Sequence, residues 1–106
     1  MEWFDSLPAK ARAKCMVRLE RLREMGHGLR RPEADYLEDG IYELRAKHIG
    51  VNYRILYFFF AREAVVVSHC IKKQQAVVAP REINLAMRRK RLFERSPERH
   101  IYKEAF

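Results

Sequence analysis

The sequence has few cysteines and no long apolar run, and these absences exclude several classes of protein. Its two cysteines, Cys15 and Cys70, occur in no CxxC or Cys/His spacing, so no metal site is predicted. Two reduced thiols are typical of a cytoplasmic protein. The longest apolar run, Ile55 to Ala61, is far too short to span a bilayer. The opening stretch MEWFDSLP lacks a basic region followed by an apolar one, so no secretory signal is predicted.

Repeats and segments of low complexity are also lacking. The 106 residues suit a single domain, 1–106, with one modest core. We therefore expect a cytoplasmic protein without a membrane segment, metal or other cofactor.

The chain is strongly basic, and the excess charge is unevenly distributed. Lys and Arg number 22 against 14 Asp and Glu, a net charge of +8. Residues 1–40 hold 8 basic and 8 acidic residues, whereas residues 41–106 hold 14 basic and 6 acidic ones, a net of +8. This asymmetry favours a polyanionic partner, with nucleic acid the first candidate, although a solvated basic surface has the same composition.

The segment SLPAKARAKCMVRLERLREMGHG predicts a helix with Ser6 as its N-cap and Pro8 in its first turn. One apolar stripe recurs at helical spacing: Ala11, Cys15, Leu19 and Leu22. Gly26 or Gly28 should end the helix. The next stretch, LRRPEADYLEDG, carries a proline and an Asp-Gly turn signal, and we interpret it as a loop.

Three segments with strand character follow, separated by short turns: 41–48, 51–61 and 64–72. Turns this short permit only antiparallel neighbours. A second helix begins at Pro80, has Glu82 in its first turn and extends to Phe93, and residues 96–106 form a polar tail. The predicted fold is thus α+β: an N-terminal helix, a three-stranded antiparallel meander and a C-terminal helix. The first helix should cover the Tyr42/Leu44 face of the sheet, and Arg54 should lie where the other face opens.

Basic residues converge in this fold. In a hairpin turned near Gly50, Arg45 or Lys47 falls near Asn52 and Arg54 across the ladder. Lys72 and Lys73, at the end of the third strand, lie beside the start of the second. Either the group binds an anion, or Glu43 and a more distant acid neutralise it. Arg54 can equally be a structural arginine paired with Glu43 or Glu82, and the two lysines an ordinary solvated strand end.

Such a group suits RNA cleavage, in which a 2′-hydroxyl attacks the adjacent phosphate and cations stabilise the charge that develops. Arginine and lysine supply that charge without a metal. His48, next to the turn, is a candidate acid or base. His69 shares parity with Val65 and Val67, so we expect it to be partly buried. A basic run in the last helix is either a solvated helix face or an RNA contact: Arg88, Arg89, Lys90 and Arg91.

Five stretches in order carry a resemblance to a known family: DSLPAKARAK, LEDGIYELRAKH, YRILYFF, SHCIKK and PREINLAMRR. Together they resemble the phage-derived branch of the HigB/RelE-like toxins of type II toxin–antitoxin modules, from Asp5 to about Phe93. The resemblance implies helices packed on a twisted antiparallel sheet and metal-free cleavage of mRNA in the ribosomal A site. It implies catalytic roles for Arg45, Arg54, Lys72 and Lys73. It also implies a HigA-like helix-turn-helix antitoxin as partner.

The chain departs from that family in three places. A strand usually precedes the first helix, and its lack would leave a sheet edge exposed. The connector QQAVVAP is apolar, with Ala79 where a capping threonine is usual. The general acid that some relatives carry near the C-terminus has no clear match here; Tyr102 lies in that direction, but no motif aligns it with that residue. Two alternatives therefore stand: a ParE-like toxin that binds a protein such as gyrase, and an inactive remnant that binds only its antitoxin.

Overall fold

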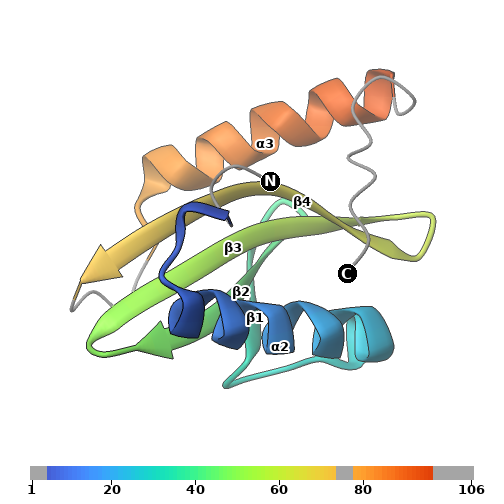
Figure 1. Ribbon diagram of the computed structural model, residues 1–106. Helices are drawn as coiled ribbons and strands as arrows, with labels where there is room; N and C mark the ends of the chain where they lie inside the picture. Colours follow the sequence, from blue (N-terminus) through green and yellow to red (C-terminus); the bar gives the residue numbers. More distant parts are fainter. Residues whose placement is uncertain (1–4, 74–77, 97–106) are drawn as a thin grey trace.

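The computed structural model describes residues 5–73 and 78–96 (Figure 1). Its elements follow in the order α2 (Ala9–Met25), η1 (Gly26–Gly28), β1 (Ala34–Glu38), β2 (Ile41–His48), β3 (Val51–Phe60), β4 (Glu63–Lys73) and α3 (Pro80–Arg95). The strands form one antiparallel sheet in the order β1-β2-β3-β4. Figure 1 shows α2 on one side of this sheet and α3 on the other. The α+β class and the meander of β2, β3 and β4 are confirmed.

The prediction of three strands is wrong, because part of the expected loop is β1. Ala34 pairs with Leu44 and Tyr36 with Tyr42, before the register shifts between Tyr36 and Glu38. Ala34 is 1% exposed and the strand is only five residues long. So short a segment, placed between a proline and an Asp-Gly turn, takes its strand conformation from pairing with β2 rather than from its own propensity.

Helix α2 buries the predicted stripe of Ala11, Cys15, Leu19 and Leu22. Its start differs from the prediction. Pro8, not Ser6, occupies the N-cap position without a side-chain cap, and the Pro8 carbonyl accepts the first helical bond from Arg12 N at 2.9 Å. At the other end Gly26 has φ +53° and its N–H bonds to Leu22 O, so the predicted stop is confirmed.

Each helix covers its own face of the sheet. The α2 stripe packs on the even-numbered residues of β2 and the odd-numbered residues of β3, namely Leu44, Ala46, Tyr53, Ile55 and Tyr57. Helix α3 covers the other face with Ile83, Ala86 and Phe93, which pack against Ile41, Leu56 and Phe58. Glu82 lies in its first turn and Ala79 at its N-cap, as predicted. The α3 cover ends at Leu56, so the next residue on that face, Arg54, lies at its border.

The prediction that His69 is partly buried is wrong, because β4 contains a β-bulge. Leu56 pairs with Ser68 and Tyr57 with Val66, which leaves Val67 as an extra residue in β4. The alternation predicted from Val65 and Val67 therefore changes at this point, and His69 is exposed. Among residues 5–73 and 78–96, no helix combines the length and apolar character needed to cross a membrane.

Candidate anion-binding site beside the β2–β3 hairpin

Three strands bring polar and basic residues together beside the part of the sheet on which α3 packs. Arg45 of β2 lies directly opposite Arg54 of β3, and Lys47 lies opposite Asn52. In β4, Lys72 pairs with Asn52. The predicted convergence of Arg45, Lys47, Arg54 and Lys72 is present in the strand register.

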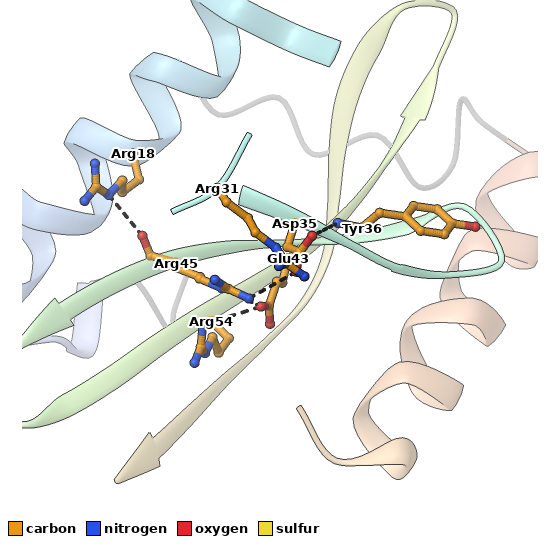
Figure 2. A network of polar contacts seen from close by, with 7 residues as sticks. All are labelled: Arg18, Arg31, Asp35, Tyr36, Glu43, Arg45 and Arg54. Carbon is orange, nitrogen blue, oxygen red and sulfur yellow. Dashed lines mark hydrogen bonds and ion pairs between the residues drawn. The ribbon is translucent and has the colours of Figure 1, made fainter. Parts of the chain in front are cut away.

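The two facing arginines share one carboxylate. Glu43 Oε1 accepts a hydrogen bond from Arg45 Nε at 2.6 Å and from Arg54 Nη1 at 3.5 Å (Figure 2). The side chains of Arg54 and Glu43 are 7% and 2% exposed. Like charges opposite each other in a ladder are destabilising, and Glu43 offsets this repulsion. Of the two acids that the sequence offered as partners for Arg54, Glu43 and Glu82, the structure pairs it with Glu43.

A second acid comes from β1. Asp35 Oδ2 contacts Arg45 Nη2 at 3.3 Å and Arg31 Nη2 at 2.7 Å. The hydrogen bond from Arg31, followed by the charges of Arg31 and Arg45, holds the pKa of Asp35 below its ordinary value against the opposing effect of burial. Asp35 is the distant acid that the sequence could not identify, because the segment that forms its strand has the composition of a loop.

Helix α2 contributes two more arginines, which pair with a third acid, Glu33. Arg18 Nη1 forms an ion pair with Glu33 Oε2 at 2.9 Å, and Arg21 Nε donates to the same oxygen. These contacts, with the Arg21 hydrogen bond the strongest, lower the pKa of Glu33. Sequence analysis missed both Arg18 and Glu33. The available signal was that Arg18 lies off the apolar stripe of α2, and no spacing linked it to a carboxylate 15 residues away.

Arg18, Arg45 and Arg54 border a hollow of about 340 Å³. Its lining is Arg18, Pro32, Arg45, Ala46, Lys47, Asn52 and Arg54. Among the described residues that line it, none is acidic and four carry a positive charge. Arginine and lysine N–H groups in a partly desolvated hollow bind anions more strongly than the same groups do in water. The geometry therefore suits a phosphate group.

The structure separates some of the predicted residues from this hollow. His48 pairs with Val51, whose side chain packs against the α2-side core, so the register places His48 on the opposite face from Arg54. Lys73 also pairs with Val51. The side chains of Lys72 and Lys73 lie outside the described part of the structure, as do Tyr102 and residues 74–77 of the connector.

The basic run in α3 divides into two groups. Arg88 and Arg91 are exposed. Arg89 Nη1 donates to Val67 O at 2.8 Å, and Lys90 Nζ donates to Asp39 O at 3.2 Å while lying 5.9 Å from the centre of the Phe58 ring. Arg89 therefore attaches α3 to β4, and Lys90 attaches it to the β1–β2 turn. In the described ranges, no group of three or more His, Cys, Asp or Glu side chains could hold a metal ion.

Residues 2–91 match the family described as phage derived protein Gp49-like (DUF891). The chain belongs to this family, which is of the RelE toxin type. The match covers every element from α2 to most of α3, including all lining residues of the hollow. Comparison with curated proteins gave no significant match.

Proposed function

We propose that this Gp49-like protein is the toxin of a type II toxin–antitoxin module and cleaves mRNA on the ribosome. The observation that carries the proposal is the pair Arg45 and Arg54, which lie opposite each other across the β2–β3 ladder and line a hollow with no acidic residue in its described lining. A phosphodiester is the anion that an RNA substrate would bring to this hollow.

The chemistry uses these groups for electrostatic stabilisation. When the 2′-hydroxyl attacks, negative charge grows on the oxygens around phosphorus, and guanidinium groups placed beforehand stabilise it without reorganising. Arg54 is the stronger of the two because its side chain is nearly buried, whereas that of Arg45 is 30% exposed. Lys47, which also lines the hollow, extends the positive charge along β2. In this proposal His48 takes no part, because it lies on the other face.

The exposed face of α3 provides a second surface for RNA. Four arginines recur along it at helical spacing: Arg81, Arg88, Arg91 and Arg95, all exposed. Helix α3 lies on the same face of the sheet as Arg54. We assign this stripe to contacts with the RNA backbone outside the reacting phosphate. The partner in this proposal is a helix-turn-helix antitoxin, which would occlude the hollow.

One observation favours a second candidate. Glu43 already pairs with Arg45 and Arg54, and Asp35 pairs with Arg45. Such pairing is typical of an ion-pair network with a structural role. A ParE-like toxin that binds a protein target, or an inactive form that binds only an antitoxin, needs no free catalytic charge.

Expression in cells distinguishes these candidates. The chain is induced with and without a co-expressed antitoxin gene, RNA 5′ ends are mapped, and plasmid supercoiling is measured in the same cultures. We expect growth arrest with new cuts within translated mRNA, relieved by the antitoxin. Intact mRNA with reduced supercoiling would contradict the nuclease and indicate a gyrase inhibitor, whereas unchanged growth would indicate the inactive form.

A further inference from the structure

Glu43 is an acid at the point where two arginines of the hollow face each other. It lies in β2, two residues before Arg45 on the same face, and it is opposite Leu56, so Arg54 is its diagonal neighbour across the ladder. Its side chain is 2% exposed. A buried carboxylate is unfavourable unless it is paired, and both of its described contacts are to these arginines.

The carboxylate directs one oxygen at both partners. Oε1 accepts from Arg45 and Arg54, while Oε2 is buried and has no hydrogen-bond partner among the residues that the structure describes. The negative charge of Glu43 therefore acts on the two guanidinium groups that line the hollow.

This arrangement places two anions in competition. A phosphate in the hollow would need N–H groups of Arg45 and Arg54, and Glu43 is already bound to both. An arginine has five N–H donors, and Glu43 and Asp35 engage Nε and Nη2 of Arg45. Arg45 thus keeps donors for a ligand, but the nearby carboxylates reduce the net positive charge that the ligand meets.

We propose that Glu43 is a positioning residue that acts on the substrate phosphate through Arg45 and Arg54. It fixes the orientation of both guanidinium groups, and as an internal counter-anion it weakens their binding to the phosphate before reaction. This inference deepens the proposed function and rests on it. The contribution of Glu43 to the rate comes from the orientation of the two guanidinium groups, because a fixed counter-anion opposes negative charge in the ground state and the transition state alike.

The test uses Glu43→Gln, which keeps the shape and one acceptor oxygen but removes the charge. We expect this variant to bind an RNA with a 2′-deoxy cleavage site about tenfold more tightly, because one repelling charge near the phosphate is lost. Cleavage of the all-ribose RNA should be at least about tenfold slower in kcat, because the guanidinium groups are less firmly oriented. A purely structural role would instead weaken binding and rate together.

Two further variants make the test specific. Glu38→Gln changes the net charge equally at an exposed residue of β1, and should match the unsubstituted chain in binding and kcat. Asp35→Asn, at a side chain that is 20% exposed, removes the charge of a partner that Arg45 shares with Arg31 and leaves Arg54 paired with Glu43, so it should bind the RNA more tightly by a smaller factor. It provides the binding measurement if Glu43→Gln fails to fold.

Titration with inorganic phosphate separates this inference from the proposed function. Tighter phosphate binding by folded Glu43→Gln than by Glu38→Gln supports the counter-anion role, even if no variant cleaves RNA and the nuclease proposal fails. Asp35→Asn takes its place in this comparison only if Glu43→Gln does not fold. Binding of RNA and phosphate no tighter than in Glu38→Gln would overturn the counter-anion role. An unchanged kcat in folded Glu43→Gln would overturn the positioning role.

Discussion

The Nε atom of Arg18 in α2 donates a hydrogen bond to the main-chain carbonyl oxygen of Arg45 in β2, at 3.0 Å. Beside it, the N–H of Arg45 donates to Glu33 O at 2.8 Å. The ladder between β1 and β2 ends at the Ala34–Leu44 pair, so these two bonds continue the support of β2 where strand pairing stops. Helix α2 and the segment before β1 thereby fix the backbone that carries Arg45 into the hollow.

The first prediction tests this support. Arg18→Met keeps the apolar stem but removes the bond to Arg45 and the ion pair with Glu33, and we expect a loss of about 1–2 kcal/mol in the free energy of unfolding. Lys14→Met, an exposed position on the same helix, should change that free energy by less than about 0.5 kcal/mol. Urea unfolding measures both, and equal stability of the two variants would show that the Arg18 contacts do not hold β2.

The second prediction concerns acid pH. The pKa values of Glu33 and Asp35 are lowered in the folded protein from ordinary values of 4.5 and 3.8, chiefly by hydrogen bonds from Arg21 and Arg31. A carboxylate with a lowered pKa contributes stability that is complete above its ordinary pKa and is lost as the pH falls through the folded value. Stability should therefore be constant near neutral pH and decline progressively below about pH 4.5.

Urea unfolding at a series of pH values checks this decline. Glu33→Gln combined with Asp35→Asn should be less stable than the unsubstituted chain at pH 7, and its stability should fall less between pH 5 and pH 3. Parallel profiles for the two chains would rule out a stabilising role for these carboxylates.

Apolar periodicity predicted most of the fold, because long amphipathic elements bury one recurring face. The stripe from Ala11 to Leu22 and the bounds of β2 are as predicted. Strand β1 was not predictable, since five residues beside a proline carry too little pattern and depend on β2 for pairing. The bulge at Val67 was equally hidden, because nothing in the repeated valines of β4 indicates which one is extra.

The candidate site was predictable only in part. Parity and connectivity brought Arg45 and Arg54 together, because the register of a tight hairpin follows from its turn. Glu43 could be named as their partner from the sequence. Asp35, the second partner of Arg45, could not be assigned, since it lies in a segment interpreted as a loop. The prediction of His48 as acid or base is not supported by its position. His48 is close to Arg54 along the strand, but the alternation of side chains puts it on the other side of the sheet.

The third prediction concerns the contact between Lys90 and the β1–β2 turn. Gly40 has φ +80°, and a Cβ there would lie 2.8 Å from Lys90 Nζ. Gly40→Ala should cost about 1–2 kcal/mol for the left-handed backbone, plus the loss of the bond from Lys90 to Asp39 O. Gly50→Ala is the matched control, because its φ is +72° and nothing lies within 4 Å of its added Cβ.

The free energies of unfolding of both alanine variants are compared in the unsubstituted chain and in a Lys90→Met background. Gly40→Ala should be the more destabilising in the first and should match Gly50→Ala in the second. A difference that persists without Lys90 would mean that the contact with Lys90 is not its cause.

The last prediction tests whether the site needs the guanidinium group of Arg54 or only its charge. Arg54→Lys keeps a positive charge beside Glu43, so no buried carboxylate is left unpaired, but it loses the planar fork that binds two phosphate oxygens at once. We expect RNA cleavage to fall about 100-fold, the loss typical when one donor to the developing charge is removed. Arg62→Lys, exposed in the turn between β3 and β4, should cleave at the rate of the unsubstituted chain. Thermal unfolding of both variants establishes that they are folded. If folded Arg54→Lys cleaves RNA at the full rate, then a point charge suffices at this position, and the bidentate role of Arg54 is wrong.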